Sequence, residues 1–424
     1  MEKLAYPALG ETLYRETLPN GLRVLVAAKP GFRRSHAIFA TRYGGADRRF
    51  RLGGQWIETP AGVAHFLEHK MFDMPDGSNV LVELSARGAS PNAYTGSAVT
   101  AYHFTCTEGF SANLDTLLTY VSTPYYTPES VQKEQGIIGQ EIRMYENSPG
   151  TVGYYQLMEI LYDHHPVREN VAGTVESIAQ ITPETLYNCH KVFYNPSNMV
   201  LCCVGDVDPS AVVAAAERIL PRSPGEVPVR DYGPAETPLP RERRAERAME
   251  VSSPLFYLGA KLTAPESGTE RMRAQVLAEL ALDYLAGPSS GLYNELYAKG
   301  LLSRDFGCEV DDAAGAMTLL VAGESRDPEA VAAALAERVE RIARRGVDEA
   351  AFERCRRARY GIELGGLDRF SGYAGALYRG CMAGWNALDV FDVLRGVTAE
   401  DAADFLCSAL SPERPAMSVI RPAD

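Results

Sequence analysis

The sequence lacks long apolar runs. No stretch approaches the ~18 to 20 apolar residues that cross a bilayer, and the longest, such as MVLCCV at 199–204, have the length of a β-strand. The first residues, MEKLAYPALGETLYRE, lack the apolar core of a secretory signal. We therefore expect a cytoplasmic protein that does not insert into a membrane.

Positive charge is in the minority. The chain has 42 lysines and arginines against 55 aspartates and glutamates, a formal net charge of −13. This balance argues against a general positive field for binding nucleic acid or anionic lipid. Cys-x-x-Cys pairs are also missing among the eight cysteines. Cys202 and Cys203 are adjacent, so on a strand they would face opposite sides, and we expect reduced, buried thiols.

What the sequence does contain is a mixture of strand and helix signals, in a chain long enough for two domains. An Asn20–Gly21 turn within residues 16–29 predicts a β-hairpin, and the Thr, Tyr and Val content of residues 92–107 predicts paired strands. Six prolines between residues 221 and 240 indicate a linker. Apolar spacing and capping residues predict helices at 61–72, 79–88, 111–122 and 127–147.

The two halves of the chain resemble each other. ELSARG at 83–88 recurs as ELYAKG at 295–300, a shift of 212 residues (295 minus 83) in a chain of 424. A strand and polar turn at 199–209 match a similar pattern at 317–328, and each is followed by an alanine-rich helix. Agreement in order favours a duplicated α+β unit.

The segment GVAHFLEHKMF at 62–72 suggests a metal site. On a helix His65 and His69 share one face, and two imidazoles provide half of a tetrahedral zinc shell. Glu68 is displaced along that face, where its carboxylate can take a proton from an attacking water. The alternative is an ordinary apolar helix with satisfied polar residues. The second half argues against it, because the same shift places Leu277, Leu280 and Ala281 there.

A catalytic zinc site needs a third protein ligand and one open position. Glu134 and Glu141 lie seven residues apart on one face of the helix at 128–146, with Ile138 between them. In the second half, Cys355 and Ile362 stand opposite these two glutamates. Spacing alone leaves open which of the two carboxylates binds the metal.

Three motifs in this order, residues 62–72, SPNAYTG at 90–96 and EQGIIGQE at 134–141, resemble the inverted-zincin peptidases. That family includes pitrilysin, insulin-degrading enzyme and the mitochondrial processing peptidase. The resemblance implies one Zn²⁺ and assigns the roles as follows: His65, His69 and Glu141 as zinc ligands, Glu68 as general base and Glu134 as the supporting carboxylate.

The resemblance also implies a fold. It predicts an α+β protein with two related α/β-roll domains, each an antiparallel-rich sheet with helices on one face, that together form half of a clamshell. The expected boundaries are a zinc-binding catalytic domain at 1–222, a linker at 223–245 and a related domain without metal at 246–424. Asn92 and Ala93 would lie on an edge strand and bind the backbone of a peptide substrate. The alternative for Asn92 is a turn residue.

One motif of the family is missing. Active members carry a segment like Arg-x-Lys-x-x-Leu-x-Tyr, whose Arg/Tyr pair contacts the substrate and the developing oxyanion. Here the corresponding stretch is YAKGLLSRDF, with Tyr297 at the arginine position and no tyrosine near Ser303. Tyr293 and Arg304 are nearby, but neither matches the motif. We therefore expect a heterodimer with a related chain that supplies the pair, although a homodimer is possible.

The predicted function is a zinc metalloendopeptidase subunit that hydrolyses peptides or small unfolded polypeptides. The alternative is a scaffold or maturation-complex subunit that keeps its zinc site but has little turnover.

Overall fold

The computed structural model describes residues 1–263 and 265–423. The chain forms two compact units that interleave along the sequence. Unit 1 consists of Met1–Ile142, Asn170–Tyr232 and Leu364–Ala387, and unit 2 of Arg143–Glu169, Gly233–Glu363 and Leu388–Asp424. The contiguous domain boundaries expected from the sequence remain a prediction.

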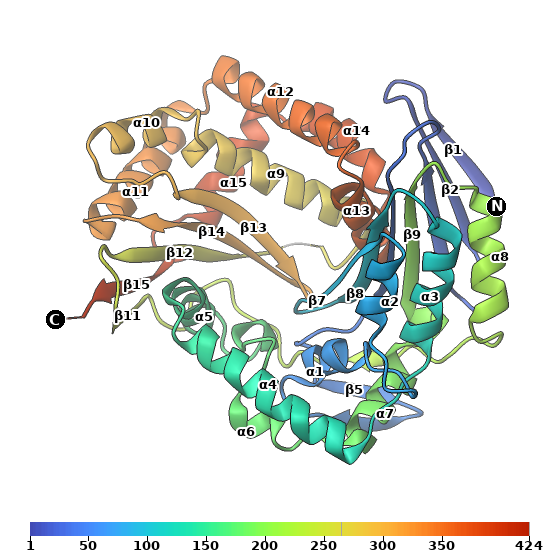
Figure 1. Ribbon diagram of the computed structural model, residues 1–424. Helices are drawn as coiled ribbons and strands as arrows, with labels where there is room; N and C mark the ends of the chain where they lie inside the picture. Colours follow the sequence, from blue (N-terminus) through green and yellow to red (C-terminus); the bar gives the residue numbers. More distant parts are fainter. Residues whose placement is uncertain (264, 424) are drawn as a thin grey trace. The chain divides into compact units, whose positions relative to one another are not determined.

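Unit 1 contains a seven-stranded sheet in the order β1-β2-β3-β9-β4-β8-β7 (Figure 1). The β3–β9 pair is parallel and the other neighbours are antiparallel. The predicted hairpin at Asn20–Gly21 is confirmed: it joins β2 to β3, and Gly21 has a φ of 85°. The strands are β1 Glu2–Tyr6, β2 Glu11–Thr17, β3 Arg23–Ala28, β4 Ser35–Thr41, β7 Ser90–Thr95, β8 Thr100–Cys106 and β9 Met199–Gly205.

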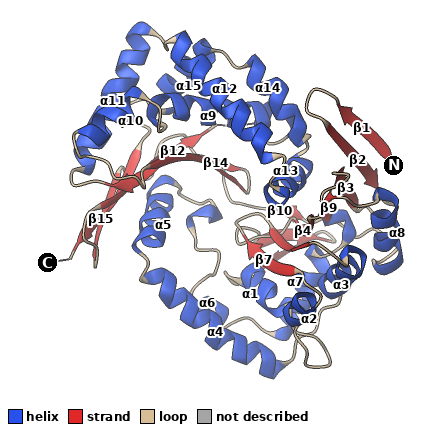
Figure 2. Ribbon diagram, turned by 45° about the horizontal axis from the view of Figure 1, so that its top comes forward, coloured by secondary structure: helices blue, strands red, loops and turns tan. Residues whose placement is uncertain are grey.

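Helices cover both faces of the central strands of this sheet. Successive residues of a strand face opposite sides, and every residue of β4 and β9 is buried. Helices α3 and α8 pack on β8, β4 and β3 (Figure 2), while α13, from late in the sequence, packs on β9 and β4. The helices of unit 1 are α1 Val63–Lys70, α2 Val80–Ala86, α3 Phe110–Ser122, α4 Pro128–Glu146, α6 Val175–Ile178, α7 Pro183–Phe193, α8 Pro209–Ile219 and α13 Phe370–Ala383. The boundary of unit 1 falls within α4, after Ile142.

Unit 2 contains a five-stranded sheet in the order β11-β15-β12-β14-β13, again with one parallel pair, β11–β15. Its strands are β11 Arg244–Met249, β12 Leu255–Leu262, β13 Gly307–Ala313, β14 Ala316–Glu324 and β15 Ala416–Pro422. Its helices are α5 Pro149–Leu161, α9 Gly268–Ala286, α10 Gly291–Ala298, α11 Pro328–Arg345, α12 Glu349–Gly366, α14 Val390–Gly396 and α15 Ala399–Ala409. The boundary of unit 2 falls within α12, after Glu363. Helix α5 packs on β12 and β15.

The two sheets repeat one topology, which confirms the predicted pair of related, antiparallel-rich α+β units. The order β11-β15-β12-β14-β13 corresponds to β3-β9-β4-β8-β7, with the parallel pair in the same place. One detail of the predicted match is wrong. Residues 317–328 do not correspond to 199–209, because β14 lies beside the edge strand β13, whereas β9 is a central strand between β3 and β4.

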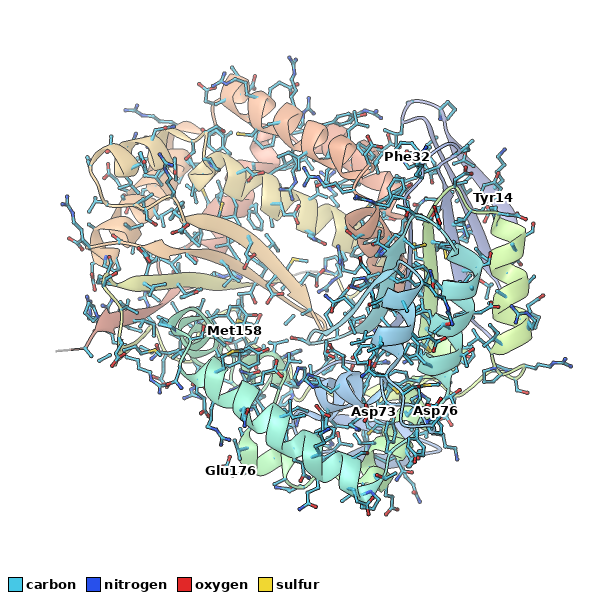
Figure 3. The ribbon with its side chains drawn as sticks, viewed as in Figure 1. Tyr14, Phe32, Asp73, Asp76, Met158 and Glu176 are labelled. Carbon is cyan, nitrogen blue, oxygen red and sulfur yellow. The ribbon has the colours of Figure 1, made fainter. Side chains whose placement is uncertain are left out.

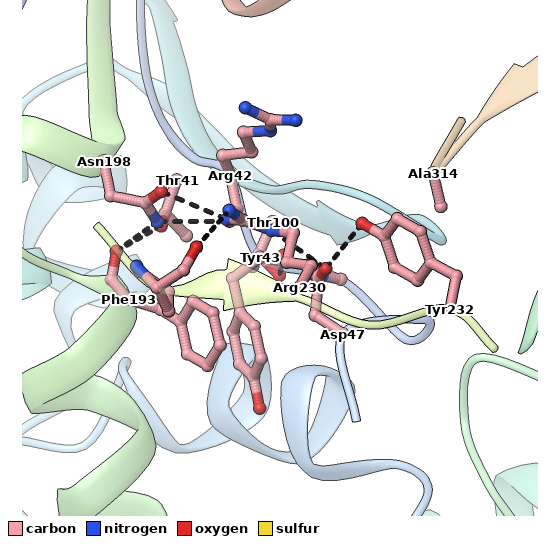
Figure 4. Close-up of polar contacts among 12 residues, drawn as sticks. Thr41, Arg42, Tyr43, Asp47, Thr100, Phe193, Asn198, Arg230, Tyr232 and Ala314 are labelled. Carbon is pink, nitrogen blue, oxygen red and sulfur yellow. Dashed lines mark hydrogen bonds and ion pairs between the residues drawn. The ribbon is translucent and has the colours of Figure 1, made fainter. Parts of the chain in front are cut away.

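The predicted linker is held in place at its start. In a small sheet of order β10-β5-β6, β10 Val229–Arg230 pairs with β5 Arg49–Leu52, which also pairs with β6 Gln55–Glu58. Asp47 is 1% exposed, and it forms an ion pair at 3.0 Å with Arg230 Nε and accepts a 2.8 Å hydrogen bond from the Tyr232 hydroxyl (Figure 4). The first part of the proline-rich segment is therefore fixed to unit 1 by a buried ion pair and by strand pairing.

In the described part of the chain, we find no helix with the length and apolar character of a membrane span. Cys202 and Cys203 are both fully buried on β9, as expected, together with Cys106 and Cys189. The other four cysteines are half-buried.

Candidate metal centre

Helix α1 presents two histidines on one face. It begins after Gly62, whose φ of 93° and whose position, where a Cβ would lie 2.6 Å from the Ala172 carbonyl oxygen, both favour glycine. Phe66 and Leu67 are fully buried and fix the rotation of the helix. The rings of His65 and His69 are 4.7 Å apart, so one turn of helix brings them together as the sequence spacing predicted.

Helix α4 brings Glu141 to these histidines. Its two carboxylate oxygens lie 3.7 Å from His65 Nε2 and 3.5 Å from His69 Nε2. One ligand atom from each of the three residues lies within 4.8 Å of the others, and the described residues contain no second group of this kind. Two imidazole nitrogens and one carboxylate oxygen form a donor set that suits a zinc ion with an open position.

Glu134 has a different place from Glu141. Its Oε1 accepts a 3.0 Å hydrogen bond from His69 Nδ1, and its Oε2 is 4.0 Å from Lys70 Nζ. Lys70 is 1% exposed and also pairs with Asp73, in the segment after α1 (Figure 3). Because His69 Nδ1–H donates to Glu134, the other ring nitrogen of His69, Nε2, is directed toward Glu141. This is the arrangement in which an outer carboxylate orients a metal-binding histidine.

The protonation of the two histidines differs. Burial, and then the charge of His69, lowers the pKa of His65 to about 4, so His65 is neutral and its Nε2 can bind a metal. Burial acts to lower the pKa of His69, but the hydrogen bond that His69 Nδ1 donates to Glu134 and the charges of Glu134, Glu141 and Glu68 raise it overall.

Glu68 lies beside the three ligands without belonging to them. Its Oε2 accepts a 2.6 Å hydrogen bond from Thr95 Oγ1, at the end of β7. Burial raises the pKa of Glu68, partly offset by this hydrogen bond and by the charge of His69. The sequence reasoning did not identify Thr95. The available signal was its place in SPNAYTG, two residues after Ala93 and therefore on the same side of the strand.

Asn92 and Ala93 lie on β7, which is the edge strand of the seven-stranded sheet. Their side chains face opposite sides, because strand residues alternate. Ala93 shares its side with Thr95 and helix α1, whereas Asn92 shares its side with Tyr94, whose hydroxyl bonds that of Tyr378 on α13 at 2.6 Å. The Asn92 side chain accepts a hydrogen bond from the Ala93 N–H at 2.9 Å. Binding of a substrate backbone by these two residues remains a prediction.

The corresponding helices of unit 2, α9 and α12, are joined by charged residues that the sequence comparison overlooked. Arg359 of α12 pairs with Glu279 and Asp283, one turn apart on α9, and with Glu363. Its Nη1 lies 3.5 Å from Asp283 and its Nε 3.1 Å from Glu363. The expected apolar residues are present as well, since Leu280 and Ala281 are fully buried.

The stretch YAKGLLSRDF follows helix α10 into a loop. The rings of Tyr293 and Tyr297 stack with centroids 5.8 Å apart, and Tyr297 is 43% exposed. A hydrogen bond with Tyr297 raises the pKa of the exposed Arg304.

Comparison with family models gives two adjacent matches. Residues 53–175 match the model described as insulinase (peptidase family M16), and residues 180–359 match that described as the peptidase M16 inactive domain. The first match contains all of the predicted zinc ligands and Glu68.

Similar proteins cover almost the whole chain. The protein named uncharacterized zinc protease YmfH, from Bacillus subtilis (strain 168), is 36% identical over 423 residues, which are 98% of this chain and 97% of YmfH. The crystal structure of an M16-like peptidase from Alicyclobacillus acidocaldarius superposes with a TM-score of 0.94 at 35% identity. The superposition covers 99% of this chain and 100% of that one.

A more distant likeness concerns the fold alone. The first half of the periplasmic protease PqqL from Escherichia coli has a TM-score of 0.75 at 15% identity, with coverage of 97% of this chain and 92% of that half. Against the longer PqqL structure, the match covers 48% of the PqqL chain at 16% identity and the same TM-score of 0.75.

Proposed function

Because this chain belongs to peptidase family M16, we propose that it is the zinc-bearing subunit of a metalloendopeptidase that hydrolyses peptides or small unfolded polypeptides. The observation that carries the proposal is the convergence of ligand atoms from His65, His69 and Glu141 within 4.8 Å, with Glu68 on the same helix as the two histidines. The names of the relatives, which are called zinc proteases, support the choice of metal.

In this proposal one zinc ion is held by His65, His69 and Glu141. A zinc ion held there would supply Lewis-acid chemistry for the scissile carbonyl group and would lower the pKa of bound water. Glu134 holds His69 in the tautomer that directs Nε2 to the site. Glu68 takes a proton from the attacking water and later returns it to the leaving amine, which is general acid–base catalysis by one carboxylate.

The substrate would add to the free edge of β7. An edge strand offers unpaired backbone N–H and C=O groups, which bind an extended peptide with little dependence on its sequence. We assign Asn92 and Ala93 to this contact. Such binding selects chains that can become extended, and so favours peptides and unfolded polypeptides over folded proteins.

We further propose that a related chain completes the active site in a heterodimer, with a homodimer as the other possible arrangement. The support is the absence of the Arg-x-Lys-x-x-Leu-x-Tyr segment from this sequence. The match to the longer PqqL structure covers 48% of that chain, which is compatible with a second, related chain. The partner would supply donors for the developing oxyanion.

The alternative, a scaffold subunit with little turnover, has one supporting observation: the model that matches residues 180–359 is described as an inactive domain. That match lies outside the segment that carries His65, Glu68, His69 and Glu141. The complete set of ligands and base therefore favours the peptidase.

The test compares the wild-type protein with Glu68→Gln and with a control, Glu58→Gln, on the exposed strand β6. Zinc per chain is measured by elemental analysis, and hydrolysis of internally quenched peptides is measured with and without the related chain. We expect Glu68→Gln to keep its zinc and lose hydrolysis, and the control to keep both. Unchanged hydrolysis in Glu68→Gln would sink the proposal.

A further inference from the structure

Strand β7 and the base Glu68 are joined by a single side-chain hydrogen bond. Thr95 Oγ1 lies 2.6 Å from Glu68 Oε2. An ionised carboxylate can only accept, so the Thr95 hydroxyl is the donor, and hydrogen bonds of this charge-assisted type are short and strong. Glu68 Oε1 makes no hydrogen bond within the described part of the chain, which leaves one oxygen of the carboxylate free for chemistry.

The Thr95 hydroxyl is itself held in one orientation. Across the β7–β8 pair its partner is Thr100, which is fully buried. Thr100 Oγ1 donates to the Tyr43 carbonyl oxygen at 2.9 Å and lies 3.3 Å from Thr95 Oγ1. Of the two oxygens that could accept the Thr95 proton, Glu68 Oε2 at 2.6 Å is closer than Thr100 Oγ1 at 3.3 Å and carries charge, so the Thr95 hydroxyl donates to Glu68.

The backbone at Thr95 is braced as well. The β7–β8 turn is closed by a 2.8 Å hydrogen bond from Gly96 N to Val99 O. A second loop supports this turn, since Gly45 N donates to Gly96 O at 3.0 Å. A Cβ at Gly44 would lie 2.4 Å from Gly96 O, so the two loops are in close contact. Thr95 is therefore attached to a rigid part of the sheet.

We propose that Thr95 is a positioning residue, which fixes the Glu68 carboxylate relative to the edge strand that binds the substrate. The inference rests on the proposed function and adds a specific part to it. A peptide paired with β7 and a base that is hydrogen-bonded to the last residue of β7 are both positioned by the same strand. The distance between the base and the scissile bond then depends on β7 itself, and much less on the packing of helix α1. Such placement matters because misplacement by about 1 Å can cost about a hundredfold in rate.

The alternative explanation is that the bond only fastens α1 to the sheet. The two explanations differ in what a substitution does. Thr95→Val removes the hydroxyl and keeps the shape, whereas Thr95→Ser keeps the hydroxyl and loses the methyl group. Thr119→Val is the matched control, because it makes the same change at an exposed threonine of helix α3, whose hydroxyl bonds only the Asp115 carbonyl oxygen of its own helix among the residues described.

The experiment loads each variant with zinc, assembles it with the related chain, and measures kcat and KM on internally quenched peptides, together with zinc content and a crystal structure. For Thr95→Val we expect unchanged zinc, KM within about twofold and kcat lower by about 10- to 100-fold, with Glu68 in a different or a second conformation. Thr95→Ser should recover most of kcat, and Thr119→Val should match wild type.

Unchanged kcat in Thr95→Val, or equal losses in the Val and Ser variants, would overturn the proposal. So would a Thr95→Val structure in which Glu68 keeps its position. If the wild-type protein hydrolyses no peptide under any condition, the proposed function itself fails. The conformation of Glu68 in Thr95→Val then decides the positioning role alone.

Discussion

Replacing Arg359 by methionine should destabilise unit 2 and do so more strongly at alkaline than at acidic pH. Arg359 is 21% exposed, and Glu279, Asp283 and Glu363, which surround it, are 21%, 33% and 35% exposed. The substitution keeps the apolar stem and removes the guanidinium that pairs with all three carboxylates. Breaking a fully buried pair costs about 3–5 kcal/mol and an exposed pair less than about 1 kcal/mol. For a cluster exposed to this extent we expect a loss of about 2–4 kcal/mol at pH 8.

The pH dependence follows from the direction of the pKa shifts. Burial raises the pKa of Asp283 and of Glu363, while Arg359 acts to lower both. Removing Arg359 therefore raises them further. A carboxyl with a raised pKa in the folded protein contributes stability below its unfolded pKa, and this is lost as the pH rises through the folded pKa. The variant should lose less stability at pH 5 than at pH 8.

Urea unfolding of the wild type and Arg359→Met at both pH values measures these differences, and hydrogen exchange in α9 and α12 locates them. Arg341→Met is the control, since Arg341 is 50% exposed and pairs with the 73% exposed Glu337. Its expected loss is below about 0.5 kcal/mol. Millimolar Ca²⁺ should stabilise Arg359→Met and leave the wild type unchanged, because oxygen ligands suit that ion. A loss no larger than that of the control, or one that grows toward pH 5, would refute the reasoning.

Three further predictions concern unit 1. Removing zinc with a chelator should lower the melting temperature, and adding zinc back should restore it. At a free zinc concentration 100 times Kd, binding should add about 2.7 kcal/mol to the free energy of unfolding. An unchanged melting temperature would contradict the metal site. Asp47→Ala should cost about 3–5 kcal/mol in urea unfolding, because it leaves Arg230 buried without its carboxylate; a loss below ~1 kcal/mol would contradict this. Burial lowers the pKa of His190 to about 4, so stability should fall between about pH 6.5 and 4, by up to ~3 kcal/mol. In His190→Gln the free energy of unfolding should depend less on pH across that range.

The sequence predicted the metal site where local periodicity decides the geometry. His65 and His69 share a helix face because they are four residues apart, and the structure confirms that they lie together. The distinction between Glu134 and Glu141 could not come from spacing, since both face one side of the helix. It depends on which imidazole nitrogen each carboxylate approaches, and that follows from how α1 lies against α4.

The exchange of helices between the units could not be predicted. An apolar face shows that a helix is buried, but it does not name the sheet that covers it. Helices α5 and α13 each pack on the sheet of the unit whose strands lie mainly in the other half of the sequence. The buried Asp47–Arg230 pair was missed for the same reason. The two residues are far apart in the sequence, and the proline-rich composition around Arg230 gave no sign of burial.

The two related helix pairs solve one electrostatic problem in different ways. Each gathers three carboxylates at the contact between its helices: Glu68, Glu134 and Glu141 in unit 1, and Glu279, Asp283 and Glu363 in unit 2. In unit 2 the chain itself supplies the balancing cation, because the Arg359 guanidinium is always protonated. A guanidinium only donates hydrogen bonds and has no vacant position to accept a lone pair, so it can act as neither Lewis acid nor exchangeable ligand. In unit 1 the chain supplies Lys70, 4.0 Å from Glu134, but two imidazoles stand beside Glu141, and we propose that a metal ion from solution provides the remaining balancing charge. The chemistry we propose for the first half is therefore closed to the second by Arg359 as much as by the loss of the histidines.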